Sequence, residues 1–244
     1  MLSIGITVQT IYIQIMVNKE IVIAAYDKPT DWLDSINTNI KKTIYRKGSV
    51  LPLSSGEILI EPNIGRCVHT FFNHILTNYN NLSDYTFFAQ DYPFDHWEDL
   101  IDVINNDVNL LNEKSALSIG GYWGFHFNSI RVPSSNGGIM HTMSPSKDHE
   151  NGKVISCYGN GMPHDHNSKI NVDTYWDMLF EEPRPNMYEF IPGGHFGITK
   201  EHVKLRSKKL YKKITELLEE DVTSPWMIER LECYIFNPKY KTKL

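Results

Sequence analysis

The segment Ile60-Glu61-Pro62-Asn63-Ile64-Gly65-Arg66 opens the stretch that decides the fold, and this stretch ends in Tyr85-Thr86-Phe87-Phe88-Ala89-Gln90-Asp91-Tyr92-Pro93-Phe94-Asp95-His96. Between the two segments, apolar side chains recur at helical spacing on one face: Val68, Phe71, Phe72, Ile75, Leu76 and Tyr79. The order predicts an amphipathic helix capped by Asn63 and followed by a buried strand.

Both ends of this predicted helix–strand pair carry groups suited to a ligand. Gly65 and Arg66 fall in the first helical turn, where free backbone N–H groups and a guanidinium attract an anion. Asp91, Asp95 and His96 follow the strand, and ligands of open α/β sheets bind at the carboxyl ends of strands. An anion site beside carboxylates suits a nucleotide diphosphate with a divalent cation, Mn²⁺ or Mg²⁺.

A purely structural interpretation of the same residues stays open. Asp95 and Glu98 have the spacing of a capping box for a following helix. Arg66 can equally serve as a surface ion-pair partner. The order of the whole block, rather than any one residue, favours the functional interpretation.

The composition indicates one soluble α/β domain without nucleic-acid partners. The chain has 244 residues, a formal net charge of −5 and a pI of about 6.0, so it lacks a basic footprint. Cys67, Cys157 and Cys233 form no CxxC pair, which favours a reducing compartment and a cytoplasmic location. Residues 1–19 are apolar only over a short, interrupted run, so we expect an edge strand or an extension ahead of Met16, and no membrane span.

Further elements follow from periodicity and from glycine and proline positions. The early chain predicts a strand at 20–26, a helix capped by Thr30 and a strand at 43–45, the opening of a doubly wound fold. The later elements are helices at 95–111, 171–180 and 200–219, strands near 120–124 and 190–198, and a final helix ending near Pro238. Residues 133–170 lack periodicity and predict a long loop.

Asn63-x-Gly65-Arg66, a helix and an apolar strand ending in acidic residues together resemble the nucleotide-sugar half of GT-A glycosyltransferases. Gly193-Gly194-x-Phe196, followed by Trp226-x-x-Glu229, resembles the acceptor half of galactosyl- and N-acetylgalactosaminyltransferases. The closest resemblance is to a little-characterised set of glycosyltransferases from large DNA viruses, fungi and bacteria. The resemblance implies a single GT-A-like domain over residues 20–238, a Rossmann-like mixed sheet flanked by helices, with a nucleotide-sugar half at 20–111 and an acceptor half at 112–238.

This resemblance implies transfer of a sugar from a nucleotide-diphosphate donor, a UDP-sugar first of all, to a glycan or other hydroxyl acceptor. The implied site residues are, for the donor, Ala25, Tyr26, Asn63, Gly65, Arg66, Gln90 and Asp91; on the acceptor side, Gly193, Gly194 and Trp226; for catalysis, Glu229 and His195; and for the metal, Asp91, Asp95 and His96. Glu229 takes the position of the general base. A viral origin would place the protein in the host cytoplasm.

One departure from the family pattern bears on the metal. The usual Asp-x-Asp motif falls on Ala89-Gln90-Asp91, so its first carboxylate is missing. This departure favours an alternative, a non-catalytic nucleotide- or glycan-binding module on a transferase-like fold. A second alternative is a metal-assisted hydrolase that uses the histidine-rich segment, which contains His141, His149, His164, Asp165 and His166.

Overall fold

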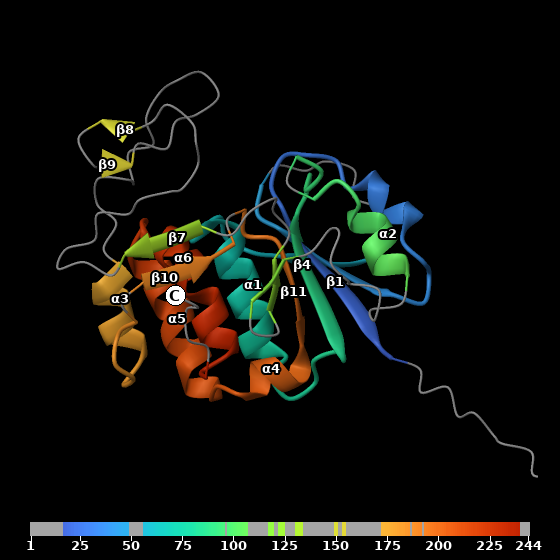
Figure 1. Ribbon diagram of the computed structural model, residues 1–244. Helices are drawn as coiled ribbons and strands as arrows, with labels where there is room; N and C mark the ends of the chain where they lie inside the picture. The colour runs from blue at the N-terminus through green and yellow to red at the C-terminus, as the bar shows by residue number, and fades with distance from the viewer. Residues whose placement is uncertain are drawn as a thin grey trace, which may run out of the picture.

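The computed structural model describes residues 17–48, 56–95, 97–106, 172–185, 187–191 and 193–239, together with the backbone of short strands at 117–119, 122–124, 130–133, 149–150 and 153–154 (Figure 1). The predictions for residues 1–16 and for most of the 133–170 loop therefore lie outside the described residues.

Four parallel strands form one half of the main sheet. They are β1 (Lys19–Ala25), β2 (Lys41–Arg46), β3 (Glu57–Ile60) and β4 (Tyr85–Gln90), arranged in the order β3-β2-β1-β4. The near-continuous apolar sequences of β1 and β4 match strands that are covered on both faces. Strands β1, β2 and β4 confirm the prediction, whereas β3 falls in a segment to which the sequence analysis assigned no strand.

The other half of the sheet is antiparallel to β4. Its described strands are β11 (Phe196–Thr199), β6 (Tyr122–Gly124) and β5 (Leu117–Ile119), which complete the order β3-β2-β1-β4-β11-β6-β5. Two small antiparallel pairs lie apart from this sheet: β10 (Met187–Phe190) with β7 (Ile130–Pro133), and β8 (His149–Glu150) with β9 (Lys153–Val154). The main sheet is therefore mixed, with parallel and antiparallel strands, and the fold is α/β.

The predicted single strand at 190–198 is wrong, because the chain turns within it. Gly193 has a φ of 108° and Gly194 a φ of 65°, values that glycine adopts readily and other residues rarely do. Strand β10 therefore ends at Phe190 and β11 starts at Phe196 in a different sheet.

Helices cover both faces of the sheet (Figure 1). Val22 and Ala24 of β1 face α1 (Arg66–Thr77), α3 (Val172–Leu179), α5 (Lys208–Glu220) and α6 (Ser224–Phe236), and this side holds the larger core. Ile21 and Ile23, which alternate with them, face the 3₁₀ helix η1 (Asp31–Ser35) and α2 (Leu100–Asn105). The alternation places core residues on both faces, as expected for a flanked α/β sheet.

Two predicted helices have other bounds in the structure. The helix expected at 95–111 is formed, among the described residues, only at 100–105, with Asp99 rather than Asp95 at its N-cap, so the proposed capping box does not start it. The helix expected at 200–219 is two helices, α4 (Lys200–Lys204) and α5, because Ser207 is extended (ψ 152°) and caps α5 by accepting a bond from the Leu210 N–H. Thr30 precedes η1 without a side-chain capping bond.

None of the helices in the described part of the chain combines the length and the apolar character that a bilayer crossing requires.

Candidate functional site

The candidate site lies at the edge of the sheet where the four parallel strands end. The chain proceeds from β1 outward to β2 and β3 and returns at β4 on the other side of β1. The order therefore reverses between β1 and β4, and ligands of open α/β sheets bind outside the strand ends at such a point. Because β11 is antiparallel to β4, its first residues, with Gly193 and Gly194 before them, reach the same edge.

Asp91 is the centre of the loop structure at this point of reversal. Its Oδ2 accepts bonds from the backbone N–H groups of Tyr26, Asp27 and Lys28, at 2.8, 3.0 and 2.9 Å. Its Oδ1 accepts a bond from the Tyr92 N–H at 3.0 Å, and its carbonyl oxygen accepts one from Trp32 Nε1. The buried Asp91 carboxylate thereby fixes the segment that follows β1.

These bonds bear on the metal that the family resemblance implies. Of the four backbone N–H groups bonded to the Asp91 carboxylate, three bond to Oδ2 and one bonds to Oδ1, so Oδ1 keeps a further acceptor position. Asp95 is exposed, four residues further on, and His96 lies outside the described residues. Among the described residues, no three His, Cys, Asp or Glu side chains gather as a metal would need. The described residues therefore show Asp91 as a carboxylate that orders a loop, and its role as a metal ligand stays a prediction.

The turn before α1 carries Arg66 in an uncommon backbone conformation. Gly65, at the N-cap, has φ 56°, and Arg66 follows with φ 54°, the left-handed region that side chains other than glycine seldom adopt. A Cβ on Gly65 would lie 2.6 Å from His69 Cβ and 2.8 Å from the Leu218 oxygen. Asn63 is therefore not the cap of α1, and the prediction of that cap is wrong. Arg66 is exposed at the helix start.

A buried charge network supports this turn. Lys47, directly after β2, donates to the carbonyl oxygens of Ile64 (2.8 Å) and Arg66 (2.7 Å), and its Nζ lies 3.4 Å from Glu61 Oε2. Glu61 also accepts bonds from Thr70 and Asn73.

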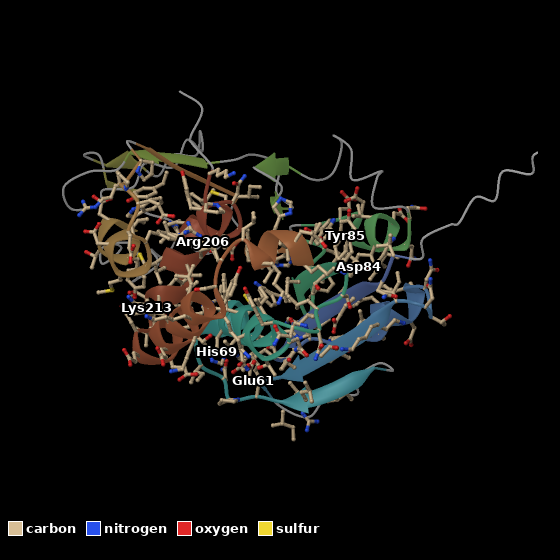
Figure 2. The ribbon with its side chains drawn as sticks, turned by 90° about the horizontal axis from the view of Figure 1, so that it is seen from below. Glu61, His69, Asp84, Tyr85, Arg206 and Lys213 are labelled. Atoms are coloured by element: carbon tan, nitrogen blue, oxygen red, sulfur yellow. The ribbon has the colours of Figure 1, made fainter. Side chains whose placement is uncertain are left out.

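The same network extends to a histidine of α1. Figure 2 shows Glu61 and His69 side by side, and Glu61 Oε1 lies 3.2 Å from His69 Nδ1. Burial alone would raise the pKa of Glu61, but hydrogen bonds from His69 and Thr70 and the charge of Lys47 hold it at about 2. Burial lowers the pKa of Lys47, and Glu61 opposes that shift.

Helix α6 brings the predicted donor and acceptor residues together. Trp226 and Glu229 lie three residues apart on it and so share one face. The Arg66 guanidinium carbon lies 5.2 Å from the Trp226 ring centroid, a cation–π distance. Glu229 Oε1 accepts a bond from the Gly193 N–H at 2.9 Å. The two halves of the predicted site therefore meet at the start of α6.

Cys67, next to Arg66 in the chain, contacts residues at the end of β4 and before β11. Its Sγ accepts a bond from Gln90 Nε2 at 3.4 Å and lies 3.8 Å from where a Cβ on Gly194 would stand. Burial raises the pKa of Cys67 to about 11, and the nearby Arg66 only partly offsets this. The thiol is therefore protonated at neutral pH and is a packing and hydrogen-bonding group rather than a nucleophile.

The other predicted site residues differ in exposure, and some lie outside the described residues. Ala25 is buried at the end of β1, Tyr26 is 52% exposed beside it, and Asn63 is exposed before the Gly65 turn. His195 is buried at the start of β11, which leaves it without direct access to a dissolved substrate. His96 and the segment with His141, His164, Asp165 and His166 lie outside the described residues, and of His149 only the backbone strand is described.

Three residues of this edge were not predicted: Lys47, Glu61 and Cys67. Lys47 carried a usable signal, since it directly follows a predicted strand at the edge where ligands bind, whereas Glu61 follows β3, which the sequence did not predict. Cys67 had no such signal, because its role depends on contacts with Gln90 and Gly194, which are distant in the sequence.

The comparison with models of protein families gives a match. The model of a family described as "Protein of unknown function (DUF3431)" matches residues 21–242, nearly the whole chain. No curated protein matches the chain.

Proposed function

The chain belongs to the DUF3431 family, and we propose that it is a glycosyltransferase that moves a sugar from a nucleotide-diphosphate donor to an acceptor hydroxyl. The observation that carries this proposal is the shared face of α6, where Trp226 contacts Arg66 and Glu229 contacts Gly193. One helix face thus joins a cation suited to a diphosphate with a carboxylate suited to a hydroxyl.

The donor side of the proposal rests on the reversal point of the sheet. A nucleotide there would have the exposed Tyr26 ring beside it and the exposed Arg66 guanidinium at the same edge of the sheet. Arg66 is suited to the diphosphate, because a guanidinium binds phosphate oxygens with paired hydrogen bonds. UDP-sugars are the first donors to test, since the resemblance to GT-A glycosyltransferases implies a UDP-sugar donor.

On the acceptor side, we propose that Glu229 takes the proton of the acceptor hydroxyl. In a single displacement, the acceptor oxygen forms a bond to the sugar anomeric carbon as the bond from that carbon to the phosphate oxygen breaks. The hydroxyl proton passes to the Glu229 carboxylate, and the nucleoside diphosphate leaves with the electron pair. Arg66 stabilises the charge that grows on the leaving diphosphate.

A divalent metal would supply additional charge for the leaving group if one were bound. Asp91 is the candidate ligand for such a metal, and the transfer described above is assigned to Arg66 and Glu229 alone. In the structure Asp91 orders residues 26–28, the segment that borders the proposed nucleotide position.

Turnover of a nucleotide-sugar panel tests the proposal, with Glu229→Gln as the decisive variant. Glutamine keeps the size of the side chain and loses its basicity, so the rate should fall on the order of a hundredfold to ten-thousandfold. Donor affinity by calorimetry should stay nearly unchanged, since the base faces the acceptor. Glu216→Gln is the matched control: Glu216 is an exposed glutamate of α5, paired with Lys212.

The outcomes separate the alternatives. Collapsed turnover with normal donor affinity in Glu229→Gln, and unchanged kinetics in Glu216→Gln, support the transferase. Tight nucleotide binding without turnover of any donor in the wild type would instead assign the chain to the binding modules. Normal turnover in Glu229→Gln would remove Glu229 from catalysis.

A further inference from the structure

We infer that Lys47 is a positioning residue that holds the Ile64–Arg66 turn so that Arg66 faces the donor diphosphate. This inference rests on the proposed function and adds to it a residue that touches no substrate. Its side chain is only 3% exposed, so direct contact with a ligand is excluded in this conformation.

All three hydrogen-bond positions of the Lys47 ammonium are directed at the turn and its support. Two donate to the carbonyl oxygens of Ile64 and Arg66, and the third direction has Glu61 Oε2 at 3.4 Å. An ammonium with three such partners in a buried position has little freedom to move. The turn is therefore tied to the end of β2 by two charge-assisted bonds.

The turn needs such a tie because its backbone is strained. Two consecutive residues, Gly65 and Arg66, have φ near 55°, and only the first is a glycine. A left-handed arginine persists when surrounding contacts over-determine it. The bond from Lys47 to the Arg66 carbonyl is made to the strained residue itself.

Lys47 is also fixed from the opposite side. Its backbone N–H donates to the Ala25 carbonyl at 2.7 Å, and a Cβ on the next residue, Gly48, would lie 2.0 Å from the Tyr26 oxygen. The ends of β1 and β2 are thus in close contact. Lys47 therefore sets the distance between the segment after β1 and the turn that carries Arg66.

The chain offers a matched control in Lys41, at the other end of β2. Lys41 Nζ lies 3.0 Å from the buried Glu20, and its side chain is 50% exposed, whereas that of Lys47 is 3% exposed. Both lysines pair with a buried glutamate, and Lys47 also donates to two carbonyl oxygens of the turn that carries Arg66. A difference in UDP affinity between Lys47→Met and Lys41→Met therefore reports the contribution of the bonds to the turn.

The experiment is a double-mutant cycle on UDP affinity, measured by calorimetry on Lys47→Met, Arg66→Ala and the double variant, with Lys41→Met as control. Lys47→Met should weaken UDP binding on the order of ten- to a hundredfold, because a displaced binding group loses its geometry. Lys41→Met should leave the affinity unchanged. In the Arg66→Ala background, Lys47→Met should cause no further loss, since Lys47 acts through Arg66. Additive losses, or no loss, would overturn the inference.

Two further measurements keep the test decisive. If Lys47→Met does not fold, Lys47→Arg keeps the charge beside Glu61 but places its donors differently, and it should lose UDP affinity while folding. If the wild type does not bind UDP, the proposed function fails separately. The Trp226 resonance in fluorotryptophan NMR, assigned with Trp226→Phe, then decides: the same shift in Lys47→Met as in Arg66→Ala supports the inference, and an unmoved resonance overturns it.

Discussion

Two buried glutamates at opposite edges of the same sheet have nearly the same environment and different consequences. Glu20 lies at the start of β1, and Glu61 lies directly after β3. Each accepts a hydroxyl hydrogen bond from a threonine, lies near a histidine of α1 and pairs with a lysine at one end of β2. Both have a pKa of about 2.

The lysines make the difference. At the Glu20 edge, Lys41 extends into solvent, and the network ends in the core: Thr43 Oγ1 donates to Glu20 at 2.7 Å and Tyr45 bonds to His74 Nδ1. At the Glu61 edge, Lys47 is buried and binds the turn that exposes Arg66. Similar chemistry thus stabilises the sheet at one edge and a candidate binding site at the other.

Acid unfolding should show that both networks stabilise the fold. Burial would raise the pKa of each glutamate, but hydrogen bonds and nearby positive charge hold it at about 2, below the ordinary value of 4.5. The stabilisation is therefore complete above about pH 4.5 and is lost as the pH falls toward 2. Each shift corresponds to roughly 3 kcal/mol.

Urea unfolding of Glu20→Gln and Glu61→Gln at several pH values measures this. Each variant should be less stable than the wild type at pH 7, and the difference should shrink between pH 4.5 and 2. Only Glu61→Gln should also weaken UDP binding. A stability difference that stays constant over this pH range would contradict the assigned pKa values. Weakened UDP binding in Glu20→Gln would show that the Glu20 edge also supports the binding site.

Arg66→Ala sharpens the contrast by removing the group that the Glu61 edge supports. We expect UDP affinity to fall by about 1.5–3 kcal/mol, the range for a hydrogen bond to a charged group. Arg184→Ala is the matched control, because Arg184 pairs with Asp173 and Asp177 near α3. Calorimetry at fixed salt measures both, and equal affinities for Arg66→Ala and the wild type would exclude Arg66 from the site.

Asp91→Asn tests whether the carboxylate after β4 orders a loop or binds a metal. The amide group would face backbone N–H donors, and each buried group left without a partner costs about 1–3 kcal/mol. We therefore expect lower stability in urea and unchanged Mn²⁺ binding in the presence of UDP. Asp95→Asn, at an exposed position, is the control. Loss of Mn²⁺ binding with unchanged stability would show that Asp91 is a metal ligand.

The sequence predicted the elements whose signal is local. Strands β1, β2 and β4 and helix α1 followed from apolar runs and from helical spacing, because burial on both faces or on one face leaves those patterns. Strand β3 and the breaks at Gly193 and Ser207 were missed. Each depends on pairing or backbone geometry that a short window does not contain.

The sequence predicted several residues of the candidate site but not the hydrogen bonds that hold them in place. The contact of Arg66 with Trp226 joins residues that the sequence had assigned to two separate halves, and the bond from Gly193 to Glu229 joins two residues of the acceptor half. The sequence did not reveal that Asp91 binds four backbone N–H groups or that Lys47 holds the Arg66 turn. Such bonds join strand ends that are neighbours only after the sheet has formed.

Hydrogen exchange with and without UDP, followed by mass spectrometry, tests most directly whether function belongs to the Glu61 edge. We predict slower exchange in segments 62–67, 90–92 and 193–195, which line the candidate site, and unchanged exchange in segments 18–20, 41–43 and 83–85 around Glu20. Protection of the Glu20 edge, or bound UDP that protects neither edge, would show that UDP does not bind at the Glu61 edge.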